Sequence, residues 1–407
     1  MQPTTQVHFS ERQTTLSNGG TAARLSAAAG IVGVGIGVGL GLARQDGLRY
    51  FWHAYLVSFV FFLSLALGAL FFVALHHATR AGWSVAVRRL GELFLGNLTL
   101  MAVLFLPILL AMLAGNQSLY EWTNPKVVAA SELLQHKARY LNLGFFGLRA
   151  AGYFVAWLLL ARFFVSRSRR QDQSGDPALT VQMERASGPA LLVFAGTVTF
   201  ASFDWLMSLE PSWFSTIFGV YYFSGTAVGF LAALILAALA VQRSGRLAGL
   251  ITVEHYHDLG KLLFGFVVFW GYIAFSQYML IWYGNIPEET VYYLKRQTGP
   301  WASVSLLLLF GNLLIPFLGL LSRAIKRRPA LLGFWAAWLL VFHWVDMYWL
   351  VMPNLGGTRL PLGLIDLALV VGMGGLFVAG VLWSAGNRPL LPVRDPRLAE
   401  SLAFENF

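Results

Sequence analysis

Two aspartates stand in apolar stretches of this chain, where a carboxylate is costly. Asp204 lies in FASFDWLMSLEPSWFSTIFGVYYFSG (200–225) and Asp346 lies in VDMYWLVMP, and each is followed seven residues later by a proline, Pro211 or Pro353. A carboxylate inside a lipid-spanning helix costs roughly 2.5–3.5 kcal/mol on insertion scales, so it needs a partner or a water-lined cavity. The pattern predicts two functional carboxylates at matching depth in a membrane.

Polar side chains near these aspartates predict a hydrogen-bonded path for protons. His343 and Asp346 are three residues apart and share one face of a helix. An imidazole titrates near neutral pH, which suits proton transfer, and a neutral imidazole that donates to Asp346 or to a backbone carbonyl is the equal alternative. Ser208 lies one turn beyond Asp204. A further polar stripe consists of Tyr272, Ser276 and Tyr283. We expect these groups to line a path that opens at the outer side.

Asp204 also has a structural interpretation. Arg149 is expected at about the same depth, and an Arg149–Asp204 ion pair would neutralise both charges and hold two helices in register. Asp366 is a further carboxylate expected in this outer third. The sequence leaves both roles of Asp204 open.

A second ionisable cluster precedes the apolar segment that begins near residue 261. His255, Asp258 and Lys261 are spaced by three and can share a helix surface that feeds protons from the cytoplasm. The spacing of His255 and His257 also resembles a metal site, but residues two apart on a helix do not converge. A solvated loop that ends in Lys261 is the plain alternative. We expect no metal site here.

Redox cofactors are limited by composition. The sequence has no cysteine, which excludes disulfides, Cys-ligated Fe–S clusters and covalent c-type haem attachment. A b-type haem needs two histidines that face each other, and only His53 and His343 are candidates. The prediction is a chain that binds no redox cofactor of its own.

The composition is that of a polytopic membrane protein. The 407 residues are 57% hydrophobic and 12% charged, about half the charge of an average soluble domain. Ten apolar segments are long enough to span about 30 Å of hydrocarbon. They cover residues 25–43, 50–75, 91–113, 141–165, 189–208, 215–241, 261–283, 301–321, 331–352 and 363–384. The predicted fold class is an all-α integral membrane protein with ten transmembrane helices.

Basic residues divide unevenly between the connections. Of the 29 lysines and arginines, 19 fall in the two tails (1–24 and 385–407) and the even-numbered loops, when Lys261 at the start of the 261–283 segment is counted with the loop before it, and 8 fall in the odd-numbered loops. The positive-inside rule then predicts that both tails and the even loops lie in the cytoplasm. The basic runs are topology signals, so we expect membrane lipid and no nucleic acid around this chain.

The recurrence of the aspartate motif four spans apart predicts an internal repeat. The two units are a first four-helix bundle, residues 50–208, and a second, residues 215–352. The glycine-rich segment 25–43 and the last segment, 363–384, would then be peripheral helices. Glycines in a spanning helix let neighbouring backbones approach closely, so we interpret 25–43 as a packing helix.

Two outer loops carry helix-start signals. Asn124-Pro125 combines a capping residue with a proline at the first helical position, and Pro287 is followed by Glu288 and Glu289 at the positive end of a helix dipole. Both patterns predict short helices at the membrane surface.

Three stretches are similar to the ActF family of membrane subunits of alternative complex III. They are HYHDLGKLLFGFVVFWGYIAFSQYMLIWYGNIPEET (255–290), the 200–225 stretch and HWVDMYWLVMP (343–353). The resemblance covers all ten spans, residues 25–384. It implies a relation to the polysulfide-reductase (NrfD-like) membrane subunits, which carry two four-helix bundles.

The resemblance carries functional expectations. Alternative complex III is a bacterial quinol:cytochrome c oxidoreductase, so the implied location is the bacterial cytoplasmic (inner) membrane. The implied partners are an ActC paralogue and subunits that bear haem c and Fe–S clusters. Quinol or quinone, of menaquinone or ubiquinone type, would bind in or near the subunit. The residues that fall on the family's motifs are Asp204, His343, Asp346, His255, Asp258 and Lys261.

The predicted function is therefore an integral subunit of a quinol-oxidising complex that contributes a proton path or a quinone-adjacent cavity. One rival is a secondary cation-coupled transporter, since paired intramembrane carboxylates also suit cation coupling. The other rival is a purely structural membrane anchor of the complex.

Overall fold

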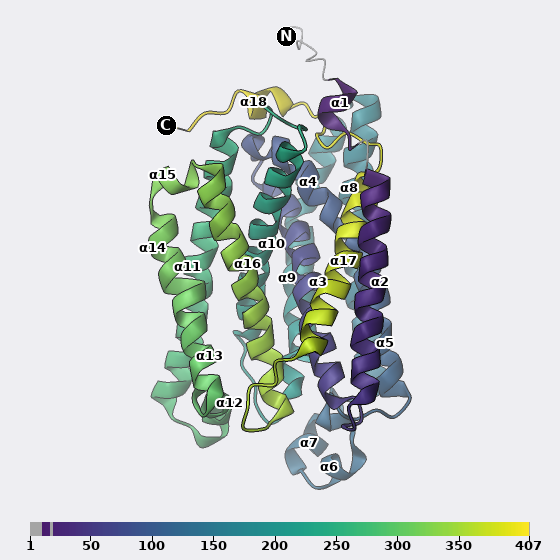
Figure 1. The fold of residues 1–407 in the computed structure, drawn as a ribbon, viewed down its shortest axis with the longest axis vertical. Helices are drawn as coiled ribbons and strands as arrows, with labels where there is room; N and C mark the ends of the chain where they lie inside the picture. Colours follow the sequence, from purple (N-terminus) through teal and green to yellow (C-terminus); the bar gives the residue numbers. More distant parts are fainter. Residues whose placement is uncertain (1–9, 17–18, 407) are drawn as a thin grey trace.

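The computed structural model describes residues 10–16 and 19–406, and within them every regular element is a helix (Figure 1). Ten crossings in this part of the chain are long and apolar enough to span a membrane. Each coincides with one predicted segment, which confirms an all-α integral membrane protein.

The bounds of the elements are as follows. Eight crossings are single helices: α2 (Gly19–Ala43), α3 (Arg49–Ala78), α8 (Leu143–Ser174), α9 (Ala178–Trp205), α10 (Phe218–Arg243), α11 (Val253–Gly284), α16 (Pro329–Val351) and α17 (Leu364–Ala385). Two are composite: η1 (Gly82–Ser84), α4 (Val85–Leu95) and α5 (Asn97–Leu113) form one, and α13 (Pro300–Leu308), the π-helix η4 (Leu309–Leu314) and α14 (Ile315–Leu321) form the other. The short helices are α1 (Glu11–Thr14), η2 (Glu121–Thr123), α6 (Pro125–Ala129), α7 (Glu132–Lys137), η3 (Met207–Leu209), α12 (Pro287–Gln297), α15 (Arg323–Lys326), η5 (Met352–Leu355) and α18 (Leu398–Leu402).

Several helices extend well beyond their apolar segments. α8 continues to Ser174 and α9 begins at Ala178, whereas the hydropathy pattern predicts an end near 165 and a start near 189. The extra turns carry Asp172 and Glu184, which pair with Arg89 of α4 and with Arg80 after α3, so hydropathy marks only the lipid-buried part of each helix.

The composite crossing α13–η4–α14 contains a local widening of the helix. In its π-helical turn the carbonyl of Gly311 accepts a hydrogen bond from the indole Nε1 of Trp338 on α16 at 2.7 Å. A Cβ on Gly311 would lie 1.8 Å from the ring of Phe342, so α16 approaches closely here. A side chain of α16 thus provides a hydrogen bond to a backbone carbonyl of the π-turn inside the apolar bundle.

Helix α3 occupies the centre of the bundle. Nearly all of its side chains are buried, and it contacts α9, α10, α16 and α17. The first unit (α3, α4–α5, α8, α9) and the second (α10, α11, α13–α14, α16) each pack internally, and α3 and α9 also pack on α10. One continuous apolar core therefore joins the two predicted units.

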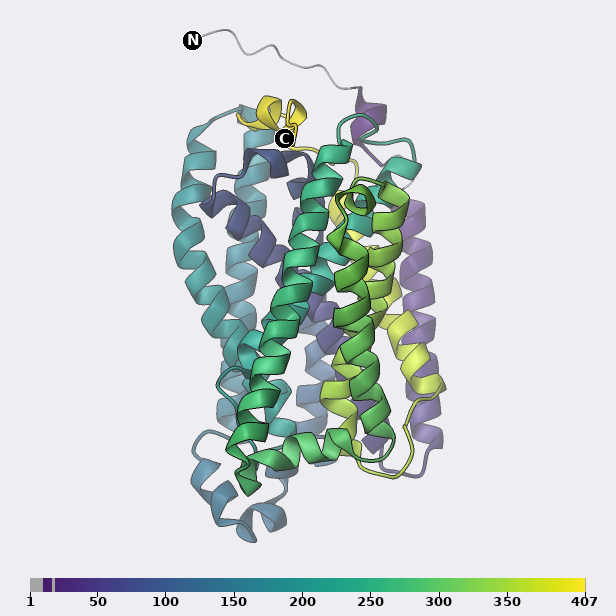
Figure 2. The same ribbon diagram turned by 90° about the vertical axis from the view of Figure 1, so that its left-hand side faces the viewer.

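The glycine-rich helix α2 packs along α17 at one edge of the bundle (Figures 1 and 2). A Cβ on Gly33 would lie 2.7 Å from the Cα of Gly372, and a Cβ on Gly30 would lie 2.6 Å from the backbone N of Leu376. These glycines permit backbone-to-backbone contact, which is the packing role expected for this segment.

The two ends of the bundle are distinct. α1 and α18 lie at one end, here called the tail end, and α6, α7 and α12 lie at the other, here called the loop end (Figure 1). The predicted surface helices are present: Asn124 caps α6, accepting from the Lys126 N–H at 3.0 Å, and α12 begins at Pro287 with Glu288 and Glu289 in its first turn.

Candidate functional site

Asp346 on α16 is fully buried in the helix core and is held by neutral donors. The hydroxyl of Tyr221 on α10 donates to its Oδ1 at 2.5 Å, and the indole Nε1 of Trp270 on α11 donates to its Oδ2 at 3.1 Å. Among the described residues, no lysine, arginine or histidine lies within ion-pair distance of this carboxylate. Three helices thus converge on an acid that has hydrogen bonds but no countercharge.

His343 lies one turn before Asp346 on the same face of α16 and is also buried. Its Nε2 lies 2.7 Å from Oγ of Ser64 on α3, and that hydroxyl donates to the carbonyl of Phe61 at 2.6 Å. Since the single hydroxyl proton of Ser64 is directed to Phe61, its oxygen accepts from Nε2–H. This network places a proton on Nε2, so that Nδ1 is the acceptor nitrogen whenever the ring is neutral.

Two glycines of α10 make room for the histidine–aspartate pair. A Cβ on Gly225 would lie 3.3 Å from both Asp346 Oδ2 and His343 Cε1, and a Cβ on Gly229 would lie 2.4 Å from His343 Cδ2. The carboxylate of Asp346 and the imidazole of His343 therefore face the same strip of α10, where Gly225 and Gly229 have no side chains. Tyr221 is on this strip as well, because residues four apart stack on one helix face.

Sequence reasoning missed Tyr221, Trp270, Ser64 and the two glycines as parts of the site. A signal for three of them was present, since Tyr221, Gly225 and Gly229 are spaced by four residues at the end of the 200–225 stretch and just after it. Ser64 and Trp270 had no comparable local signal, because their roles depend on which helices meet.

The polar groups continue from Asp346 toward the loop end along α11. Gln277, two turns after Trp270 on the same face, is buried; its Nε2 donates to Tyr293 OH at 3.0 Å, and its Oε1 lies 3.5 Å from Ser215 Oγ. Nearby on α12, burial raises the pKa of Tyr292 to about 12, and the charge of Asp346 also raises it while Arg296 opposes them. Polar side chains therefore lie between the buried Asp346 and the loop end of the bundle.

The stripe expected to line this path faces the other way. Tyr272 is 64% exposed and Tyr283 is 83% exposed on the outside of the bundle, and Ser276 is partly exposed. The spacing of these residues is correct for one helix face, but α11 turns its Leu263, Trp270 and Gln277 face to the core. The inward polar positions are Trp270 and Gln277, and the predicted stripe does not meet Asp346.

Asp204 near the end of α9 forms an ion pair with Arg149 of α8. Arg149 Nε and Nη2 donate to the two carboxylate oxygens at 2.8 and 2.9 Å, and Tyr153 OH donates to Oδ2 at 2.7 Å. The guanidinium also lies 3.8 Å from the ring centroid of Tyr140, whose pKa is raised to about 12 by burial and next by the Asp204 charge. The structural pair expected from the sequence is present, with every oxygen of Asp204 satisfied.

Ser208 does not bond the Asp204 side chain. Its hydroxyl donates to the backbone carbonyl of Asp204 at 2.5 Å and accepts from the Trp122 indole at 3.3 Å. It closes the end of α9 at the turn into η3, which is a structural role.

The cluster of His255, Asp258 and Lys261 lies at the tail end and contacts the C-terminal segment. His255 is buried, with Nδ1 2.9 Å from Thr252 Oγ1 and Nε2 3.2 Å from Ser401 Oγ. Asp258 pairs with Lys261, and Lys261 Nζ donates to Asn406 Oδ1 at 2.9 Å. His255 therefore caps α11 and anchors α18, whereas Lys261 faces outward; the predicted shared surface is divided between these two settings.

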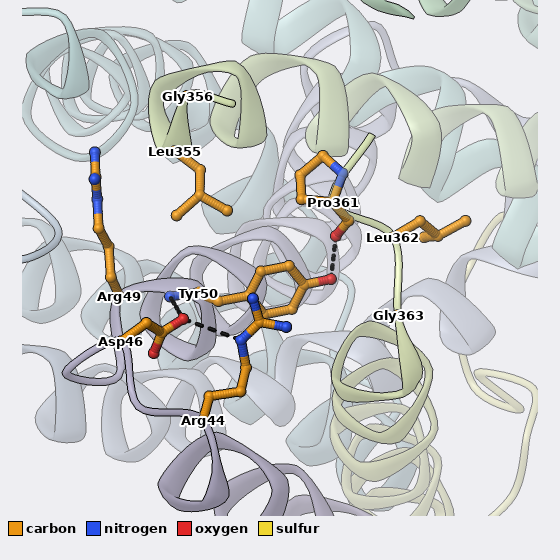
Figure 3. A pocket seen from close by; sticks show the side chains of 9 residues that line it. All are labelled: Arg44, Asp46, Arg49, Tyr50, Leu355, Gly356, Pro361, Leu362 and Gly363. Atoms are coloured by element: carbon orange, nitrogen blue, oxygen red, sulfur yellow. Dashed lines mark hydrogen bonds and ion pairs between the residues drawn. The ribbon is translucent and has the colours of Figure 1, made fainter. Parts of the chain in front are cut away.

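Asp366, in the first turn of α17, borders a surface cavity at the loop end. Its Oδ2 accepts from the Gly363 N–H at 2.9 Å and contacts the hydroxyl of Tyr50, which also contacts the carbonyl of Pro361. The adjoining cavity of 370 Å³ is shown in Figure 3, with Arg44 paired to Asp46 at 3.0 Å and pointing over the Tyr50 ring. Neither Asp204 nor Asp346 lines it.

The residues present do not fit a bis-histidine haem. Ser64, which contacts His343, is 11 residues beyond His53 on α3, about 16 Å along the helix axis. The two imidazoles thus lie at different depths, whereas axial ligands of one iron must face each other across it. In the described part of the chain, no group of three or more His, Cys, Asp or Glu is arranged to hold a metal ion.

No family model matches the sequence, and no curated protein matches it.

Proposed function

We propose that this chain is an integral membrane subunit of a quinol-oxidising respiratory complex and that Asp346 carries protons within it. The observation that supports this role is the setting of Asp346, which is buried in lipid-spanning helices and bonded only to the neutral groups of Tyr221 and Trp270. Gain or loss of a proton here leaves no unpaired cation behind. Intramembrane carboxylates of this kind mark proton relays and ion pathways.

The neighbours of Asp346 supply the rest of a relay. Tyr221 hydrogen-bonds one carboxylate oxygen, and His343 presents its acceptor nitrogen to the strip of α10 that Asp346 Oδ2 also faces. Beyond them, Gln277 and Tyr293 provide polar groups toward the loop end. Ordered waters between these groups would complete a route to that surface.

The nature of the complex follows from the resemblance of the 200–225, 255–290 and 343–353 stretches to ActF subunits of alternative complex III. On this proposal the chain lies in the bacterial inner membrane beside an ActC paralogue and subunits with haem c and Fe–S clusters, and quinone binds in or near it. The distribution of basic residues supports a cytoplasmic location for the tail end. The proton route then leads from Asp346 to the periplasmic side.

The test is an Asp346→Asn exchange in the assembled complex. Asparagine keeps size and hydrogen bonding but removes the titratable group, so we expect normal assembly and haem content with a loss of quinol oxidation or of protons released per electron. Asp176→Asn, in an exposed loop, is the matched control. Normal turnover and proton yield in Asp346→Asn would leave the chain a structural anchor.

Co-purification separates the proposal from the transporter rival. A secondary transporter is expected to purify alone, whereas this chain should retain subunits with haem and Fe–S clusters. The interrupted crossings, α4–α5 and α13–η4–α14, are the third and the eighth, so they do not occupy corresponding positions of the two four-helix units as transporter half-helices would.

A further inference from the structure

A large cavity lies near the tail end between three crossings. It has a volume of 810 Å³ and is bounded by the junction of α4 and α5, by α8 and by the end of α17. It is separate from the Asp346 site, since none of that site's residues lines it. One wall is apolar and the other carries arginines.

Three arginines line this cavity without a carboxylate partner. In the part of the chain that the structure describes, Arg162, Arg169 and Arg388 form no ion pair; Arg169 Nη2 reaches only the carbonyl of Ser384, at 3.4 Å. The one lining carboxylate, Glu92, is already engaged by Arg89 at 3.1 Å and by the Ser168 hydroxyl at 2.8 Å. The cavity therefore holds an excess of positive charge.

The apolar wall and the depth of the cavity match a lipid. Leu158 and Val165 of α8 line it, and the indole of Trp383 at its rim is 60% exposed. Arg162 is 19 residues after Leu143, about 28 Å along α8, where a 30 Å hydrocarbon layer gives way to headgroups. Cations at that level with apolar surface on the membrane side resemble the basic interhelical pockets that bind lipid headgroups.

We propose that this cavity binds an anionic phospholipid, with its phosphodiester headgroup among Arg162, Arg169 and Arg388 and its acyl chains along α5 and α8. Guanidinium groups donate paired hydrogen bonds to phosphate oxygens. A free phosphate ion would leave the apolar wall unused, and a neutral quinone ring would not compensate three cations.

The test measures lipid binding to the delipidated full-length chain by native mass spectrometry. Phosphatidylglycerol is titrated against phosphatidylcholine, on the wild type and on the triple exchange Arg162→Gln, Arg169→Gln and Arg388→Gln. We expect the wild type to prefer phosphatidylglycerol and each exchange to weaken that binding by roughly fivefold. Arg170→Gln is the matched control, because Arg170 is exposed, adjacent in sequence and outside the cavity.

Each outcome decides the proposal. Selective loss of phosphatidylglycerol binding in the triple variant, with Arg170→Gln unchanged, supports it. If the triple variant does not fold, the single exchange of the exposed Arg162 carries the same test at its own fivefold effect. Equal binding of the two lipids, or displacement of the bound lipid by millimolar inorganic phosphate or by a short-chain quinone, would overturn it.

Discussion

Arg149 and Asp204 meet through two parallel hydrogen bonds of 2.8 and 2.9 Å, whereas the matching aspartate of the second unit, Asp346, meets no cation among the described residues. The same short motif thus has two chemical settings. Protonation of Asp204 would strand a guanidinium, while protonation of Asp346 would alter only hydrogen bonds to neutral groups. This difference separates a structural carboxylate from the one we assign to proton movement.

The Arg149–Asp204 pair predicts a double-mutant result. Asp204→Asn leaves the guanidinium of Arg149, whose side chain is 10% exposed, without its countercharge, and we expect a loss of up to about 3 kcal/mol, the lower end for a buried pair. Arg149→Met combined with Asp204→Asn removes both charges, so the double variant should recover most of that stability. The measurement is the unfolding temperature and yield of the purified protein. Equal stability of Asp204→Asn and wild type would show that the pair contributes nothing.

The close contact between Gly229 of α10 and His343 predicts that a methyl group added at Gly229 lowers the stability of the protein. In Gly229→Ala the new Cβ would lie 2.4 Å from His343 Cδ2, so the histidine must shift and we expect a cost of about 1–3 kcal/mol. Gly196→Ala on α9 is the control, since a Cβ there meets no atom within 4 Å; it should gain a few tenths to about 1 kcal/mol from helix propensity. Thermal unfolding in one detergent compares them, and equal shifts would contradict the packing.

The orientation of the chain can be read with introduced thiols, because the sequence has no cysteine. Ser174 is the last residue of α8 at the tail end and Gln117 lies in the loop before η2, and both are exposed. We expect Ser174→Cys to react with a membrane-impermeant maleimide only from the cytoplasm and Gln117→Cys only from outside. The reverse labelling would invert the topology derived from the basic residues.

The C-terminal helix α18 is held against the tail end of the bundle through Ser401, here called the Ser401 clamp. The buried hydroxyl of Ser401 donates to the carbonyl of Trp83 at 2.7 Å and accepts from the Ala86 N–H at 3.1 Å. Ser401→Ala removes these two hydrogen bonds and the contact with His255 Nε2 at 3.2 Å, so we expect a loss of about 1–3 kcal/mol and faster tryptic cleavage at Arg397. Ser244→Ala, exposed and bonded only within its own turn, should behave as wild type. Unchanged cleavage in Ser401→Ala would show that the clamp does not hold the tail.

Local chemistry determined much of this fold. The ten crossings, the helix starts at Pro125 and Pro287 and the close-packing role of the glycine-rich helix were all predictable, because hydropathy, capping and small side chains act over a few neighbouring residues. The two aspartates in apolar segments, Asp204 and Asp346, were also evident from the sequence alone. These features need no knowledge of which helices meet.

Tertiary structure decided what each aspartate does. The sequence offered Arg149 as a partner of Asp204, 55 residues away, but left a functional role equally open. Tyr221, which donates to Asp346, is 125 residues away from it, and no local pattern connects these two residues. The rotation of α11 is a similar case: both the Tyr272–Ser276–Tyr283 stripe and the Trp270–Gln277 face have helical spacing. Only packing against α10 and α16 turns Trp270 inward and leaves Tyr272 outside, because a helix orients by the total surface it buries and not by its polar residues alone.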